Sequence, residues 1–129
     1  MGVAVYCFGE DAFAILLPRE VPPDVEDPID WAMRLLVAGG GLSENERADG
    51  YFSVFTSVSA DAFIGVRLSG SNLTVELDDV VQQETGFFTI AGGIWELVNQ
   101  TGLQFSGVDR VVLLIGGIEY CDLVPDIEC

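Results

Sequence analysis

The sequence predicts a single α+β domain. We expect a two-layer sandwich in which two helices lie on one face of a mixed or antiparallel sheet. Strand-like and helix-like segments alternate in the order ββαββαβ. Half of the 129 residues are hydrophobic, which is enough for a core of its own. No proline- or glycine-rich linker divides the chain, so residues 1–129 are expected to fold as one unit.

The first half of the chain predicts two strands and a helix. Residues 2–8 and 12–21 are rich in β-branched and large apolar residues, and Pro18 indicates a sheet edge or a bulge. After residue 28 the apolar residues recur at helical spacing: Ile29, Ala32, Met33, Leu36 and Val37. The glycines of "AGGG" (38–41) are expected to end this helix.

The second half predicts a hairpin, a second helix and a closing strand. In "SENE" (43–46) the serine and the second glutamate have the spacing of a capping box. Apolar residues alternate with polar or small ones through 62–80, which is typical of a β-hairpin. A helix is expected within 86–102 and a covered strand at 108–117. A further strand is expected at 118–124, within the C-terminal strand and tail (119–129).

The charge of the chain excludes several classes of function. Twenty-one acidic residues face five arginines, for a net charge of −16, and there is no lysine or histidine. Nucleic-acid binding needs clustered basic residues, so we expect no nucleic-acid partner. Without histidine the chain cannot form a Ser-His-Asp or Cys-His catalytic site, and without lysine it cannot form a Schiff base. Acidic pairs such as Glu10/Asp11 or Glu44/Glu46 are expected by chance in so acidic a chain, so we expect neither an enzyme nor a cofactor.

A carboxylate metal site is an alternative function. Four candidate ligands lie just before the first helix or in its first turn: Asp24, Glu26, Asp27 and Asp30. Calcium needs six to eight oxygens held together, and this segment has no EF-hand spacing. Asp27 is better placed as an N-cap, with Pro28 as the first helical residue and Asp30 in the first turn. The adjacent acids at 78–79 form a second, weaker cluster, because they would point to opposite faces of a strand.

Three cysteines leave several pairings open. Cys121 and Cys129 are disulfide candidates, because they close a short loop near the C-terminus. Cys7 lies in an expected strand, where it would act as a small buried apolar residue, or it could pair with either of the others. There is no CxxC spacing, which disfavours a zinc or redox site.

The order of these motifs resembles the GerMN domain, the sporulation and spore germination domain. The matching segments are "REV" (19–21), "DPI" (27–29), "LLVAGG" (35–40), "SENER" (43–47) with Gly50, and "FSGVDRV" (105–111). The resemblance covers about residues 3–118. It departs from the family pattern at Gly40 and Ser106, where proline is common, and in "IWELVNQTG" (94–102).

The resemblance implies a noncatalytic, extracytoplasmic domain of a bacterial cell-envelope or sporulation protein. Its expected partners are envelope proteins or further copies of itself, bound through the face or edge of the sheet. The precursor would be membrane-anchored or secreted. This segment itself has no apolar run of about 20 residues, so no direct membrane insertion is expected. A small acidic domain adapted to high salt is a further alternative.

Overall fold

The computed structural model describes residues 2–9, 14–55, 59–81 and 93–123. The helices and strands follow the predicted order, with short additions. In chain order they are β1 (Gly2–Phe8), β2 (Ala14–Glu20), α1 (Pro28–Val37), α2 (Glu44–Ala48), the 3₁₀ turn η1 (Ser59–Ala62), β3 (Phe63–Ser69), β4 (Asn72–Leu77), α5 (Gly93–Leu103), β5 (Arg110–Ile115), β6 (Ile118–Glu119) and α6 (Tyr120–Leu123).

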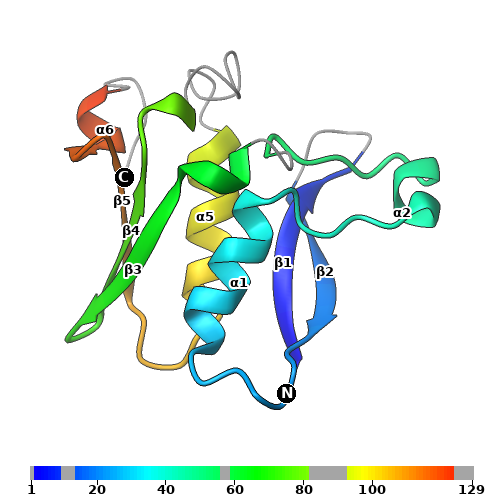
Figure 1. Ribbon diagram of the computed structural model, residues 1–129, viewed down its shortest axis with the longest axis horizontal. Helices are drawn as coiled ribbons and strands as arrows, with labels where there is room; N and C mark the ends of the chain where they lie inside the picture. The colour runs from blue at the N-terminus through cyan, green and yellow to red at the C-terminus, as the bar shows by residue number, and fades with distance from the viewer. Residues whose placement is uncertain (1, 10–13, 56–58, 82–92, 124–129) are drawn as a thin grey trace.

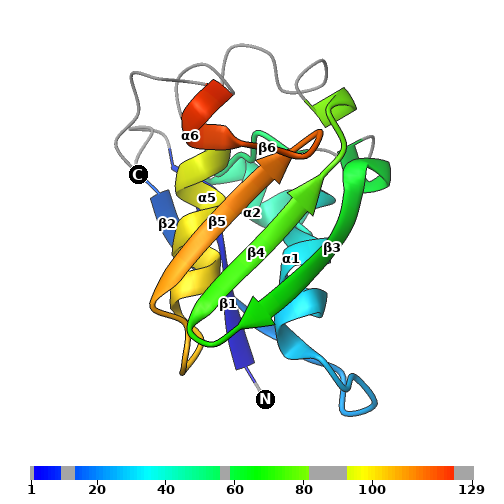
Figure 2. The same cartoon turned by 90° about the vertical axis from the view of Figure 1, so that its left-hand side faces the viewer.

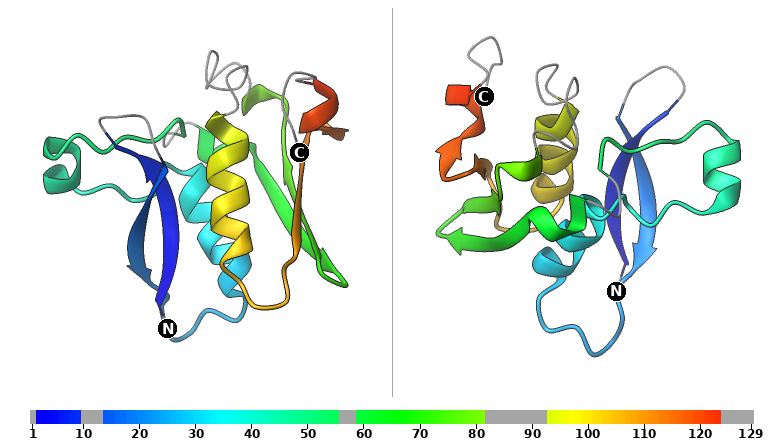
Figure 3. Two further views of the ribbon diagram at one scale, coloured as in Figure 1. Left: turned by 180° about the vertical axis from the view of Figure 1, so that it is seen from behind. Right: turned by 45° about the horizontal axis from the view of Figure 1, so that its top comes forward.

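The α+β class is confirmed, but the strands form two sheets where one was expected. β1 and β2 make a two-stranded sheet, and β3 to β6 make a four-stranded one. Helices α1 and α5 lie between the two sheets, so the molecule has three layers (Figures 1 and 3). One core cluster contains buried residues of β1, both helices and the larger sheet. A sheet therefore packs on each of two sides of the helices, whereas the two-layer prediction had a sheet on one side only.

The four-stranded sheet is mixed, as predicted. Its strand order is β3-β4-β5-β6, with β3–β4 and β5–β6 antiparallel and β4–β5 parallel. A parallel pair requires a crossover connection, and α5 lies in that connection. The buried residues alternate along the two central strands: Leu73, Val75 and Leu77 in β4, and Val111, Leu113 and Ile115 in β5. One face of the sheet packs on the helices, and the other face is turned away from them (Figure 2).

The α1 helix begins and ends close to its predicted limits. Asp27 is its N-cap, and Pro28 stands at the first helical position. The buried face consists of Ala32, Met33, Leu36 and Val37. Gly39 and Gly40 follow the C-cap with φ of 108° and 79°, a conformation that side-chain-bearing residues rarely adopt.

Helix α5 packs closely against its neighbours at one glycine. Residues 86–92 of the predicted helix lie outside the described part, which begins at Gly93. A Cβ placed on Gly102 would lie 2.7 Å from Cγ2 of Val111 and 3.2 Å from Cε of Met33. Glycine normally weakens a helix by roughly 1 kcal/mol relative to alanine. Here it permits a close approach of α5 to β5 and α1 that any larger residue would prevent.

The outer edge of β1 is covered by Thr101 of α5, by Gln104 just after that helix, and by the backbone of Phe52. The amide of Gln104 acts as a neighbouring strand would: its Oε1 accepts from the Ala4 N–H at 2.6 Å, and its Nε2 donates to the Ala4 carbonyl at 2.6 Å. The Tyr6 N–H donates to Oγ1 of Thr101 at 3.4 Å, and Phe8 exchanges two backbone bonds of 2.8 Å with Phe52. These contacts occupy the edge at which β1 would otherwise have joined a larger sheet.

The strand expected at 118–124 is wrong for residues 120–123, and residue 124 lies outside the described residues. β6 contains only Ile118 and Glu119, and the chain then forms the α6 turn. The hairpin between β5 and β6 turns through Gly116 and Gly117, with φ of 61° and 82°, which suits a two-residue turn. Tyr120 is fully buried, and its burial in the core accompanies the end of the strand.

An ion pair links β2 to α2. Arg19 binds Glu46 with both terminal nitrogens, at 2.8 and 3.2 Å, and its Nε donates to the Gly40 carbonyl at 3.1 Å. Glu46 also accepts from the Ser43 N–H at 2.9 Å, and the Ser43 hydroxyl accepts from the Glu46 N–H at 3.1 Å. The predicted capping box is therefore confirmed, and Arg19 binds the same carboxylate of Glu46.

We predict that Gln104→Ala lowers the free energy of unfolding by about 1–2 kcal/mol, because two backbone groups of Ala4 lose their partners. Urea unfolding followed by circular dichroism measures the difference. Gln100→Ala, at an exposed glutamine in the last part of α5, is the control and should change stability little. Equal losses in the two variants would contradict the role given to Gln104.

We predict that Glu46→Gln destabilises the protein near neutral pH and has a smaller effect in acid. The Ser43 N–H and the Arg19 guanidinium lower the pKa of Glu46 below its usual 4.5. Its contribution is therefore present above the unfolded-state pKa and is lost as pH falls through the folded-state pKa. Unfolding free energies measured from neutral to acidic pH test this, with Glu44→Gln in the same helix as control. A wild-type minus E46Q difference that does not change with pH would count against it.

Candidate functional site

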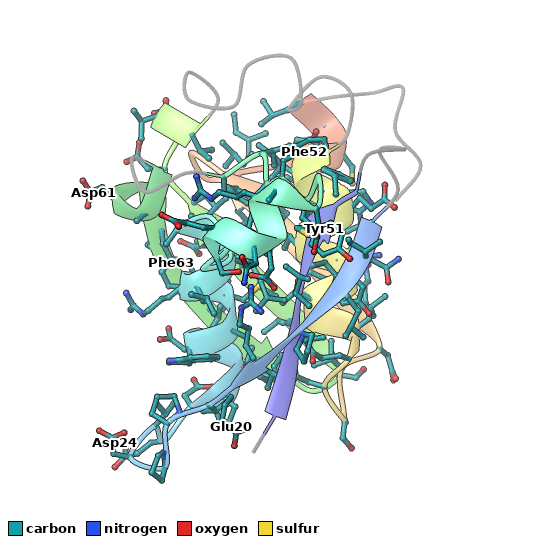
Figure 4. The ribbon with its side chains drawn as sticks, turned by 90° about the vertical axis from the view of Figure 1, so that its right-hand side faces the viewer. Glu20, Asp24, Tyr51, Phe52, Asp61 and Phe63 are labelled. Atoms are coloured by element: carbon teal, nitrogen blue, oxygen red, sulfur yellow. The ribbon has the colours of Figure 1, made fainter. Side chains whose placement is uncertain are left out.

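The four acids around the start of α1 do not form one cluster. Oδ1 of Asp27 accepts from the N–H groups of Ile29 and Asp30 at 3.1 and 3.2 Å, as an N-cap does. Oδ2 of Asp30 forms an ion pair of 2.7 Å with Nε of Arg34. Glu26 is exposed, and Asp24 lies at the tip of the loop, pointing away from the body of the molecule (Figure 4). Two of the four predicted ligands are thus engaged elsewhere.

The second acidic pair follows β4. Oδ1 of Asp78 accepts from the Val80 N–H at 3.0 Å, and Asp79 is exposed. Within the described residues, no group of three or more His, Cys, Asp or Glu side chains is placed to hold a metal ion.

Of the two acidic pairs considered for general acid–base catalysis, only Glu44/Glu46 lies among the described residues. Glu10 and Asp11 lie outside the described residues. Glu44 is exposed on α2. Glu46 is bound by Arg19 and the Ser43 N–H, which lower its pKa and keep it ionised, whereas a general acid needs a raised pKa.

The cysteines occupy different environments. Cys7 is a free thiol buried in β1. Burial raises the pKa of the Cys7 thiol to about 11, the Glu46 carboxylate adds to this, and Arg19 opposes it. The thiol is therefore protonated near neutral pH and unsuited to nucleophilic chemistry. Cys121 is disulfide-bonded, and Cys129 lies outside the described residues, so their pairing stays a prediction.

The outer face of the four-stranded sheet is a broad candidate surface. The residues between the buried positions of β4 and β5 point outward and are only partly covered: Thr74, Glu76, Val112 and Leu114. An ion pair of 3.5 Å joins Arg67 of β3 to Glu76 on this face. Figure 2 shows the sheet in front of both helices, with no described helix crossing its outer side. This is the open sheet face on which the sequence predicted contacts with a partner.

A groove runs between α5 and the edge of β5. It has a volume of about 210 Å³, and we call it the β5 groove; its lining includes Trp95, Asn99, Leu103, Arg110, Val112 and Glu119. The three α5 residues are spaced four apart and so share one side of the helix. The sequence analysis did not predict this groove. Residues 95, 99 and 103 indicate only a partly polar side of a helix, and the groove exists because β5 lies beside that side.

A second hollow of about 470 Å³ lies beside α2, and we call it the α2 pocket. Its lining includes Gly39, Leu42, Arg47, Tyr51, Phe52 and Phe55. Tyr51 and Phe52 lie together next to α2 in Figure 4. Such a lining accepts apolar groups, and Arg47 adds donors for a carboxylate. Arg19, Arg34 and Arg67, by contrast, each form an ion pair with a carboxylate of the described residues.

No described helix is long and apolar enough to cross a membrane.

We predict that Asp27→Ala lowers stability by about 1 kcal/mol through loss of the N-cap, and leaves any response to calcium unchanged. Thermal unfolding with and without calcium measures both effects. Asp24→Ala, in the same loop, is the control and should leave stability unaltered. A calcium-dependent rise in melting temperature that disappears in D27A would instead support a metal site.

Comparison with known proteins points to one kind of domain. No family model and no curated protein sequence matches this chain. Among solved structures, the first GerMN domain of the sporulation protein GerM from Bacillus subtilis matches with a TM-score of 0.72 and 18% identity, over 92% of this chain and 85% of that chain. The tandem GerMN domains of the same protein match with a TM-score of 0.70 and 20% identity, over 92% of this chain and 40% of that chain.

These identities are low, so the likeness is one of fold. It extends over nearly the whole chain, and it agrees with the family that the order of sequence motifs resembled. The chain therefore has the fold of a GerMN domain.

Proposed function

We propose that residues 1–129 form a noncatalytic binding or assembly domain of a bacterial cell-envelope or sporulation protein, located outside the cytoplasm. The observation that carries the proposal is the fold, which matches domains of a sporulation protein over 92% of the chain. The partner is an envelope protein or a further copy of the domain. The precursor is membrane-anchored or secreted.

The chemistry of the described residues supports a noncatalytic role. The Cys7 thiol is buried and protonated, and Glu46 is held ionised in an ion pair. The Cys7 side chain packs in the core, and the Glu46 carboxylate links α2 to Arg19 of β2. A nucleophilic thiol needs a lowered pKa and a general acid needs a raised one, but the pKa of Cys7 is raised and that of Glu46 is lowered.

The disulfide supports a location outside the cytoplasm. Disulfides persist in secreted and periplasmic proteins, whereas the cytosol keeps thiols reduced. Cys121 is disulfide-bonded in α6, and Cys7 is sheltered in the core as a free thiol.

The outer sheet face supports a binding role. It contains partly exposed apolar residues, Val112 and Leu114, beside the polar residues Thr74 and Glu76. Interfaces between proteins combine apolar centres with polar rims in this way.

A photo-crosslinking experiment tests the binding role. A photoreactive amino acid replaces Val112 on the sheet face, or Leu16 on β2 as an exposed control, in the full-length protein made in its own bacterium. We expect a discrete adduct in the envelope fraction from position 112 and none from position 16. A protein that yields no adduct from position 112 and stays monomeric at high concentration would contradict the proposal.

Thiol trapping in the same cells tests the location. Alkylation before and after reduction separates free from disulfide-bonded Cys121. We expect Cys121 to be alkylated only after reduction, because an extracytoplasmic protein keeps its disulfide. A freely alkylated Cys121 in freshly lysed cells would place the domain in the cytoplasm.

A further inference from the structure

Three of the strand edges are covered or interrupted. The edge of β1 is occupied by Gln104 and Thr101. In the β1–β2 pair, Ala4 stands opposite Pro18. Because the polar groups of Ala4 face Gln104, the nitrogen of Pro18 faces the outer edge of β2, where it offers no donor. On β3 the pairing with β4 is irregular between Phe63 and Gly65, and such a bulge disrupts an edge as a template for another strand.

The fourth edge, that of β5, is open over most of its length within the described part of the chain. β6 pairs only with Leu114 and Ile115, which leaves Arg110–Leu113 without a described strand on that side (Figure 2). The Arg110 N–H donates to Ser71 at 3.3 Å and the Gly116 N–H to Leu77 at 2.9 Å, both toward β4.

The direction of the remaining backbone groups follows from this pattern. In an extended strand the N–H and C=O of one residue point to the same side, and those of the next residue point to the other. Arg110, Val112 and Leu114 therefore bond toward β4. Val111 and Leu113 direct their N–H and C=O groups to the open edge, where a further strand could pair with them.

The β5 groove lies along this same edge. Trp95, Asn99 and Leu103 form its helical wall, and Leu103 is 41% exposed although it is apolar. A volume of about 210 Å³ is below the roughly 300–1,000 Å³ of pockets for drug-sized ligands. It suits one apolar side chain of an added strand better than a small-molecule ligand.

We propose that the open edge of β5 binds an extended, lysine- or arginine-bearing segment of a partner protein, which adds to the sheet as a strand in line with β6. Backbone hydrogen bonds to Val111 and Leu113 would hold the segment, and one of its apolar side chains would enter the β5 groove. This deepens the proposed function, and it rests on that function only in treating the chain as a binding domain.

The charge of the chain favours a basic segment as the strand that binds at the edge of β5. The chain has a net charge of −16, so its field attracts cationic segments and repels a second copy of itself. Asp109 and Glu119 line the groove beside one cation, Arg110. A basic segment gains from both the overall field and these two carboxylates, while an acidic one is opposed by the overall field.

A peptide titration followed by NMR tests the proposal on the whole chain. The probe is Ac-Lys-Val-Lys-Val-Lys-Val-NH2, which is extended, basic and alternately apolar. We expect saturable binding that slows hydrogen exchange of the Val111 and Leu113 amides at least tenfold, while the Val112 amide, already bonded to β4, stays unchanged. Affinity should fall as salt is added.

Two control peptides and two variants make the test specific. A twin peptide methylated on alternate backbone nitrogens, and a twin with glutamate in place of lysine, should each bind at least tenfold more weakly. Leu103→Ala in the β5 groove should weaken binding several-fold, whereas Ile64→Ala on the exposed β3 edge should not.

Several results would overturn the proposal. These are an absence of binding at millimolar peptide, equal binding of the methylated or acidic twin, or a larger effect of I64A than of L103A. Slow hydrogen exchange of the Val111 and Leu113 amides without peptide would show that the edge is already covered. Protection that is independent of protein concentration would mean that the chain covers its own edge, and protection that rises with concentration would mean that a second copy does. Val112 also lines the β5 groove, but it belongs to the outward-facing positions of the sheet, so an adduct from position 112 can still form when no peptide binds the edge of β5. Loss of peptide binding with a retained adduct would therefore overturn this proposal alone.

Discussion

The α1–α5 pair packs against β1 on one side and against the four-stranded sheet on the other. Buried residues of all these elements belong to one core cluster, which includes Val5, Met33, Leu36, Val98 and Val111. Each helix must therefore bury apolar residues on two sides. The distance between the layers is set where α5 approaches β5 and α1 at Gly102, a position at which a Cβ would overlap Val111.

The position of this helix pair also determines which backbone groups remain available. Because α5 lies against β1, Gln104 can reach the polar groups of Ala4 and cover that edge. On its other side, α5 lies beside β5 without covering its backbone, and β6 is too short to pair with all of it. One helix thus covers one strand edge and leaves a groove along another, which gives the molecule a side that is suited to binding.

Local features were predicted well because their causes are local. The N-cap at Asp27 and the capping box of Ser43 and Glu46 depend on residues within one helical turn, and both appear as expected. The alternation in β4 also held, since a strand with one buried face repeats every two residues. The order of these motifs was enough to identify the GerMN fold, although identity to the solved domains is only 18–20%.

The sequence by itself therefore determined the α+β class, the chain order and the starts of α1 and α2, since short-range capping and periodicity decide these. Only the tertiary structure decided that β1 and β2 form a separate sheet, that Arg19 binds Glu46, and that β6 pairs with only the end of β5. Each of these depends on residues far apart in the chain, such as Ala4 and Gln104, which are 100 positions apart. No local pattern records such a contact, because its free energy comes from how the layers pack together.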